Sequence, residues 1–176
     1  MEERRPQQNR PHREGGGSPR QDEHGPGHQG PSQAIAKFKQ AIASKGFTDD
    51  EVMRQSEELA KSFIKSGNKE GEKENSLTQV RKFYNQVKVV QQKANAAVDF
   101  NIIKPEVRLL QAQAAYAVGR KLLTGDFKDF FDEAAKKIIK EGQESLNDFA
   151  KFFQSVYAYF YFYTKTGEAK SEGRAQ

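Results

Sequence analysis

The stretch Ser76-Leu77-Thr78-Gln79-Val80-Arg81-Lys82-Phe83-Tyr84 opens the segment that decides the fold of this chain. Ser76, followed three residues later by Gln79, forms a capping box, which predicts the start of a helix. Apolar residues then recur at helical spacing, so we expect one face of this helix to be buried. They are Val80, Phe83, Val87, Val90, Ala94 and Val98, and the helix is expected to end near Phe100.

Helical spacing is also found upstream of this segment. We expect a short helix over residues 35–44, which Gly46 then breaks. Thr48 and Glu51 form a second capping box, and it predicts a helix that reaches about residue 66. The residues between this helix and Ser76 are polar, charged and rich in glycine, and they are expected to form a loop.

Three further helices are expected downstream. Pro105 suits the first turn of a helix, because its missing N–H would be unpaired there, and Gly125 is expected to end that helix. Asp126 can cap a helix that runs to about residue 140, and the last helix covers about 145–164. No alternating strand pattern and no hairpin dipeptide occurs. The prediction is an all-α fold, a compact antiparallel bundle of about five helices.

Composition divides the chain into a helical domain and two tails. Residues 1–32 hold five of the six prolines and the triplet Gly15-Gly16-Gly17, which predicts a disordered N-terminal tail. The helical domain is expected over 33–165, with a short polar tail over 166–176. Arginines and carboxylates balance within the N-terminal tail, so the net charge of +5 belongs to the folded part. That tail is expected either to touch RNA weakly or to be merely solvated.

The residue types that are absent argue against catalysis. The chain has no cysteine, and its three histidines, His12, His24 and His28, all lie in the predicted tail. Histidine is the usual general base near neutral pH, and cysteine is a common nucleophile and metal ligand. No phosphate-binding loop and no paired metal-binding carboxylates appear. We therefore expect no catalytic residues, no metal and no cofactor.

The chain also lacks the signals of export and of membrane insertion. No apolar run follows the N-terminal charges, and the longest one, 156–163, is far shorter than the about 20 residues that span a bilayer. We expect no membrane partner and a cytoplasmic location. A pI of about 9.3 makes a polyanion a plausible partner.

Basic residues beside the helical stripes are the first candidate site. Arg81 and Lys88 lie two turns apart on one side of their helix, and Lys82 and Lys93 lie off the opposite edge. The following helix carries Arg108, Arg120 and Lys121. If the two helices pack antiparallel, Arg81 comes near Arg120, and such a stripe suits a phosphate backbone, with Tyr84 placed to stack on a base. The alternative is that these are solvated charges, with Arg120 paired to a carboxylate.

The C-terminal helix is the second candidate site. Its inward stripe is expected to be Phe149, Phe152, Phe153, Val156, Phe160 and Tyr163. Four more aromatic side chains, Tyr157, Tyr159, Tyr161 and Phe162, fall around its other faces. A helix that is apolar all round is either central in its own core or covered by a partner. The four residues are thus either enclosed in the bundle or part of a subunit interface.

Two motifs in this chain resemble a known family. Thr78-Gln79-Val80-Arg81-Lys82-Phe83 and Ala115-Tyr116-Ala117-Val118-Gly119-Arg120 are similar to the characteristic segments of the small subunit of the type III-A CRISPR effector (Csm) complex. The likeness covers roughly 76–163. It implies a helical, non-enzymatic subunit that stacks with copies of itself in a short filament along the guide–target duplex. It also implies guide RNA, target RNA and the backbone and large subunits of the complex as partners.

These considerations give one predicted function and one alternative. The resemblance implies RNA contacts for Arg81, Lys82, Arg120 and Lys121, and helical geometry adds Lys88, Lys93 and Arg108. The predicted function is a non-catalytic RNA-binding small subunit that contacts the target RNA backbone through basic helix faces. The alternative is a purely structural helical interaction module that makes no direct contact with nucleic acid.

Overall fold

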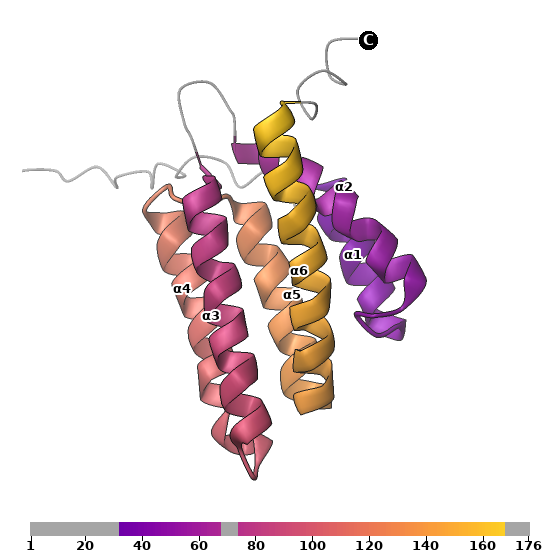
Figure 1. Cartoon of the computed structure of the whole chain (residues 1–176), viewed down its shortest axis with the longest axis vertical. Helices are drawn as coiled ribbons and strands as arrows, with labels where there is room; N and C mark the ends of the chain where they lie inside the picture. Colours follow the sequence, from indigo (N-terminus) through magenta and orange to yellow (C-terminus); the bar gives the residue numbers. More distant parts are fainter. Residues whose placement is uncertain (1–31, 68–73, 168–176) are drawn as a thin grey trace, which may run out of the picture.

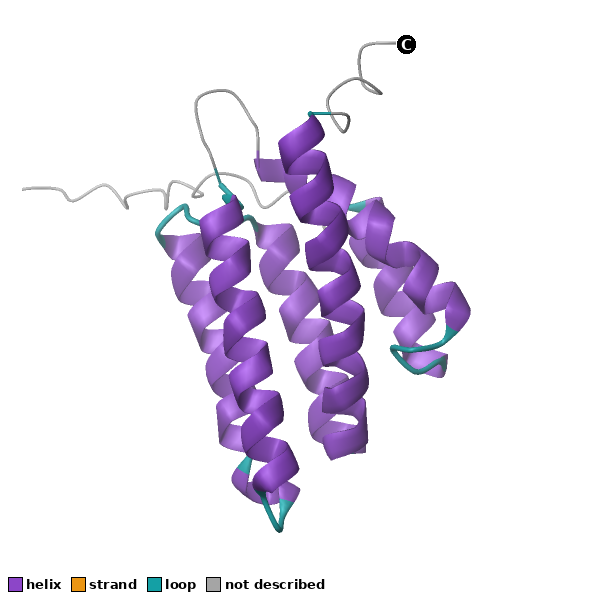
Figure 2. Cartoon of the chain, in the orientation of Figure 1, coloured by secondary structure: helices purple, strands orange, loops and turns teal. Residues whose placement is uncertain are grey.

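The computed structural model describes residues 32–67 and 74–167, which form six α-helices and one short 3-10 helix. No strand occurs among these residues (Figure 2). The helices are α1 (Gln33–Ser44), α2 (Asp50–Gly67), α3 (Leu77–Ala96), η1 (Phe100–Ile102), α4 (Lys104–Gly119), α5 (Gly125–Glu141) and α6 (Gln143–Thr166). The predicted all-α class is confirmed, but the predicted count of about five helices is wrong. Each of the six ranges in which the sequence predicts a helix does hold one, so the predicted total is one too low; Gly142, at a φ of 94°, separates α5 from α6.

The predicted tails, 1–32 and 166–176, lie almost wholly outside the described residues. The described residues at their edges belong to the folded part. The backbone N–H of Ser32 donates to a carboxylate oxygen of Asp126 at 3.1 Å, and Thr166 is the last residue of α6. The tails themselves stay predictions.

The two predicted capping boxes differ in outcome. Ser76 caps α3 as expected, because its hydroxyl accepts the backbone N–H of Gln79 at 3.4 Å. At α2 the predicted cap is wrong. The helix begins at Asp50, so Asp49 occupies the cap position, and its carboxylate rather than Thr48 accepts the N–H of Glu51 at 3.0 Å.

The corner between α4 and α5 also differs from the prediction. The α4 helix ends at Gly119, six residues before the expected stop at Gly125, which instead begins α5. Thr124 caps α5 with its hydroxyl, the role predicted for Asp126. The Asp126 carboxylate is thereby left to accept the N–H of Ser32, and so ties the start of α5 to the start of α1.

Neighbouring helices in this fold run in both relative directions. In Figure 1, α3, α4, α5 and α6 lie side by side, with α1 and α2 next to α6. The α3 and α6 helices are antiparallel, since Gln91 near the end of α3 bonds to Asn147 near the start of α6 at 3.1 Å. The α2 and α6 helices instead run in the same direction. Three hydrogen bonds follow this pair in the same order: Thr48 to Asp148 at 3.1 Å, Ser56 to Ser155 at 2.9 Å and Tyr163 to Glu57.

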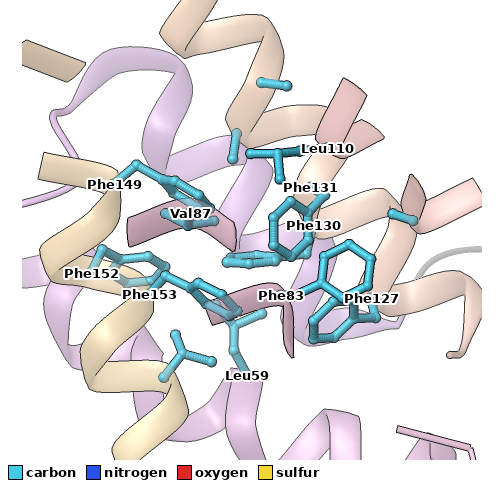
Figure 3. Packing of buried hydrophobic residues seen from close by; sticks show 14 of the residues in the cluster. Leu59, Phe83, Val87, Leu110, Phe127, Phe130, Phe131, Phe149, Phe152 and Phe153 are labelled. Atoms are coloured by element: carbon cyan, nitrogen blue, oxygen red, sulfur yellow. The ribbon is translucent and has the colours of Figure 1, made fainter. Parts of the chain in front are cut away.

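Phenylalanine rings fill the space between these helices (Figure 3). Phe130 of α5 is fully buried and lies at the centre, with seven other phenylalanine rings at centroid distances of 5.0–6.3 Å. Those rings come from α1, α2, α5 and α6, so one aromatic cluster joins four helices. A fully buried phenylalanine stabilises a fold by about 1.5–3 kcal/mol relative to an exposed one. This cluster holds α6 at the centre of the fold.

The apolar stripes predicted for α3 and α6 are mostly correct. The buried residues of α3 are Val80, Phe83, Val87, Val90 and Ala94, and those of the α6 stripe are Phe149, Phe152, Phe153, Val156 and Phe160. Tyr163 is half-buried. Val98 is a wrong prediction, because α3 ends at Ala96 and the side chain of Val98 is fully exposed.

Candidate nucleic-acid interface

Positive charge is concentrated in the part of the chain that forms α3, η1 and α4. Residues 77–121, which we term the basic segment, contain eight lysines and arginines but only two carboxylates, a net charge of +6. The whole chain has a net charge of +5, so the remaining residues together carry −1. The polyanion-binding potential therefore lies on α3 and α4 rather than over the whole surface.

The packing of α3 on α4 brings the two ends of the basic segment together. At one end of the pair, Lys93 forms an ion pair with Glu106 at 2.8 Å. At the other end, the backbone N–H of Asn75 donates to the carbonyl of Leu122 at 3.0 Å. This antiparallel register places the start of α3, with Arg81 and Lys82, beside the end of α4, with Arg120.

A groove of about 590 Å³ runs between α3 and α4, and we term it the α3–α4 groove. Arg81 and Lys82 line it, together with four aliphatic side chains from the two helices. The complete lining is Thr78, Arg81, Lys82, Asn85, Gln86, Val89, Val90, Glu106, Leu109, Leu110 and Gln113. The residues on α3 and those on α4 each repeat at three- and four-residue spacing, so each set lies on one side of its helix.

Other predicted RNA contacts lie away from this groove or are already paired. The half-buried Lys88 donates to Gln91 at 2.6 Å on the side of α3 that faces α6. Lys93 is held by Glu106, as described above. Arg108 is exposed on α4. The seven predicted basic residues therefore do not form one continuous stripe.

The end of α4 carries an exposed aromatic ring that sequence reasoning did not single out. The guanidinium of Arg120 lies 5.7 Å from the ring centroid of Tyr116 and donates to its hydroxyl at 3.2 Å. Lys121 follows at a φ of 55°, an unusual backbone conformation for lysine. Tyr84, which was expected to stack on a base, stacks on Tyr157 instead, with ring centroids 4.9 Å apart and planes 10° apart.

The four aromatic residues of α6 that lie outside its buried stripe are either half-buried or exposed. Tyr157 is half-buried under Tyr84, as described above. The exposed fractions of Tyr159, Tyr161 and Phe162 are 39%, 48% and 46%. These three residues lie near the end of α6, and the structure thus leaves them available to a partner.

Beside them, Tyr163 is tied to α2. Its hydroxyl donates to Glu57, and this bond, together with Lys61, holds the pKa of the Glu57 carboxyl below its ordinary value. The same bond raises the pKa of the Tyr163 hydroxyl. The Tyr163–Glu57 bond thus anchors this end of α6 to α2.

Carboxylates of the described helices take part in ion pairs. Asp50 pairs with Arg54 at 2.6 Å, and Asp132 pairs with Lys128 at 2.7 Å. The bond to Asp132 raises the pKa of Lys128. Within residues 32–67 and 74–167, no three histidine, cysteine, aspartate or glutamate side chains form a group suited to a metal ion.

None of the helices within residues 32–67 and 74–167 combines the length and the apolar character that crossing a bilayer requires.

Comparison with known proteins gives one match. The sequence model described as Csm2 Type III-A matches residues 49–166, two thirds of the chain. No curated protein and no solved structure matches. The matched range begins earlier than the resemblance noted at roughly 76–163, because it includes all of α2. It leaves α1 outside, although Ile35 and Phe38 of α1 are buried in the core.

Proposed function

Since the chain belongs to the Csm2 Type III-A family, and so is a small subunit of the type III-A CRISPR effector (Csm) complex, we propose that it binds RNA there. The contact surface is the basic segment, and the RNA is the guide–target duplex with its target strand nearest. The family is non-catalytic, so the subunit acts by binding alone. Its other partners are the backbone and large subunits of the complex, and it works in the cytoplasm without a membrane.

The observation that carries this proposal is the net charge of +6 within residues 77–121. Phosphates repeat along an RNA backbone, and cations on rigid helices neutralise several of them at once. Arg81, Lys82, Arg120 and Lys121 make the central contacts, because α3 and α4 bring them to one end of the pair. Arg108, Lys88 and Lys93 extend the surface, and the last two exchange their present partners for phosphate.

The exposed aromatic residues of α6 support a second part of the proposal, namely self-association. Tyr159, Tyr161 and Phe162 join copies of the subunit into a short filament, with Tyr157 at the edge of the interface. Aromatic side chains are enriched among the residues that dominate protein interfaces. Stacked copies would also multiply the RNA contacts of one subunit.

The test compares two variants that lose the same charge. In the first, Arg81, Lys82, Arg120 and Lys121 all become alanine. In the matched control, four exposed lysines on other helices become alanine: Lys37, Lys65, Lys140 and Lys151. Fluorescence anisotropy with a labelled single-stranded RNA of about 40 nucleotides, titrated across salt, measures the binding. Circular dichroism checks that both variants stay helical.

We expect only the first variant to lose affinity. Each phosphate contact on a single strand contributes about 0.7 to the slope of log K against log salt, so four lost contacts lower the slope by roughly 3. Equal losses in both variants would mean that net charge, rather than this surface, drives binding. RNA binding that neither variant changes would place the RNA contacts on another surface. No RNA binding by the wild-type chain at low salt would favour the alternative, a purely structural interaction module. Two observations support the structural alternative: Lys93 is already paired with a carboxylate, and aromatic side chains of α6 are exposed.

A further inference from the structure

The α3–α4 groove has a chemistry that phosphate binding alone does not explain. Its walls include Val89 and Leu109, whose side chains are 49% and 51% exposed. Large apolar side chains that face each other across an open groove are unfavourable in water, and larger patches of this kind mark binding sites. Phosphate gains nothing from aliphatic walls. The groove is therefore shaped for a ligand that also has an apolar surface.

The polar groups of the groove are mostly neutral amides and a hydroxyl. Asn85, Gln86 and Gln113 line it, together with Thr78. The side-chain oxygen of Gln86 is buried, yet it accepts no hydrogen bond from the described residues. A buried acceptor without a donor costs free energy, and each such group calls for an explanation. Because this oxygen is out of reach of solvent, the accessible amides and the hydroxyl of the lining are the groups that can bond to the edge of a ligand.

Arg81 and Lys82 add a positive end to the same groove. Its volume of about 590 Å³ falls within the range of about 300–1,000 Å³ that is usual for small-ligand sites. The occupant must thus combine a flat apolar body, hydrogen-bonding edges and a negative group. An unstacked nucleotide has all three features.

We propose that the α3–α4 groove binds the unstacked base of one RNA nucleotide, with the adjoining phosphate held by Arg81 and Lys82. The base lies between Val89 and Leu109, and its edge bonds to the amides that line the groove. This inference rests on the proposed function, because it adds a base site to the same RNA surface. A base within a duplex is stacked and paired, so this site selects single-stranded or locally unpaired RNA.

The experiment removes the apolar walls and leaves the cations in place. Val89→Ser combined with Leu109→Ser is the groove variant. The matched control is Val98→Ser combined with Ile102→Ser, because these two residues are 103% and 67% exposed and lie outside the groove. Full-length protein is titrated with single-stranded RNA that carries 2-aminopurine bases, and separately with the same sequence as a duplex. Anisotropy reports affinity, and 2-aminopurine fluorescence reports unstacking.

We expect the groove variant to bind the single strand roughly tenfold more weakly, because it loses the apolar area that the base covers on two aliphatic side chains. Its affinity for the duplex should equal that of the wild-type chain, and so should its slope of log K against log salt. The rise in 2-aminopurine fluorescence should appear with the wild-type and control proteins and be lost with the groove variant. If the double variant unfolds at a clearly lower temperature than the wild-type chain, the test is repeated with Val89→Gln alone, because glutamine has a good helix propensity.

Three results would overturn the inference. The first is a groove variant that binds the single strand as tightly as the control does. The second is an equal loss on single strand and duplex. The third is an altered oligomeric state in sedimentation velocity without any change in RNA binding, which would assign the groove to a second copy. If any of these results occurs while RNA affinity still falls with salt as in the wild-type chain, the base site is wrong but the proposed phosphate contacts of the basic segment are not contradicted. If wild-type protein binds no RNA, both proposals fail.

Discussion

Replacing Asn75 tests how the fold holds α3 against α4. This side chain is 3% exposed and lies before α3, where the end of α2 and the α4–α5 connection meet. Its amide nitrogen donates to the carbonyl of Phe63 and to the hydroxyl of Thr124, both at 2.9 Å. Its amide oxygen accepts the backbone N–H of Thr124 at 2.9 Å. One asparagine therefore joins three segments.

The magnitude follows from the bonds that alanine would lose. Each of the three contributes about 0.5–1.5 kcal/mol net, and the left-handed backbone of Asn75, with a φ of 51°, costs alanine roughly 1 kcal/mol more. Part of this loss is offset, because the Ser66 hydroxyl lies 3.3 Å from both the Phe63 carbonyl and the Thr124 hydroxyl. We expect Asn75→Ala to lower the free energy of unfolding by about 2–4 kcal/mol.

Two further substitutions separate the causes. Asn75→Gly loses the same bonds but adopts the left-handed conformation readily, so it should be less harmful than alanine. Asn75→Asp keeps an acceptor for the N–H of Thr124 but turns a carboxylate toward the Phe63 carbonyl. Because neither oxygen can donate at neutral pH, aspartate should be the most harmful of the three.

Urea denaturation followed by circular dichroism measures the whole series. The reasoning would be refuted if the alanine variant unfolded within about 0.5 kcal/mol of the wild-type chain, the range of ordinary surface substitutions. A glycine variant less stable than the alanine variant would refute the backbone argument alone. Either result would mean that the neighbouring backbone bonds suffice to hold this junction.

Three more predictions concern the core, an acidic side chain and the end of α6. Phe130→Ala removes the central ring and should lower the free energy of unfolding by about 3–5 kcal/mol in urea titrations, whereas Phe130→Leu should cost clearly less. Burial raises the pKa of Glu133, but hydrogen bonds from two lysines outweigh it and hold that pKa below 4.5. The folded chain then binds fewer protons there than the unfolded chain, so this stabilisation is present above pH 4.5 and lost as the pH falls through the folded pKa. Glu133→Gln should flatten the acid side of Tm against pH, and an unchanged profile would contradict this. Tyr161→Ser with Phe162→Ser should weaken self-association in sedimentation velocity without loss of helicity, while lost helicity would mean that these rings support the fold.

Local sequence signals predicted most of the helices and their buried faces. The stripe of α3 followed directly from apolar spacing, and Ser76 caps that helix as expected. Errors arose where several residues competed for one role. Asp49 and Thr48 are both good caps; in the structure Thr48 bonds to Asp148 of α6, and Asp49 caps the helix. Likewise, the contact of Asp126 with α1 left the capping of α5 to Thr124.

The arrangement of the helices and the α3–α4 groove had no such local signal. Helical spacing shows which face is buried but not which partner buries it, so it did not predict the parallel pairing of α2 with α6. The groove needs two helices in a particular register, with Val89 and Leu109 on facing sides. The charge of residues 77–121 was present in the sequence, but its meaning depends on α3 and α4 being neighbours.

The charges of α3 are hard to explain by folding alone. The other long helices use carboxylates to stabilise themselves. The α2, α4, α5 and α6 helices each have at least one in the first turn, and in α2 and α5 carboxylates also pair with a lysine or arginine at four-residue spacing. Each such feature contributes about 0.2–1 kcal/mol. The α3 helix has four cations and no carboxylate anywhere along its length. It therefore gains no stability from a first-turn carboxylate or from ion pairs within the helix. Local rules that are broken without a structural gain are expected at functional sites. A ligand that supplies the missing negative charge explains this helix better than its own stability does.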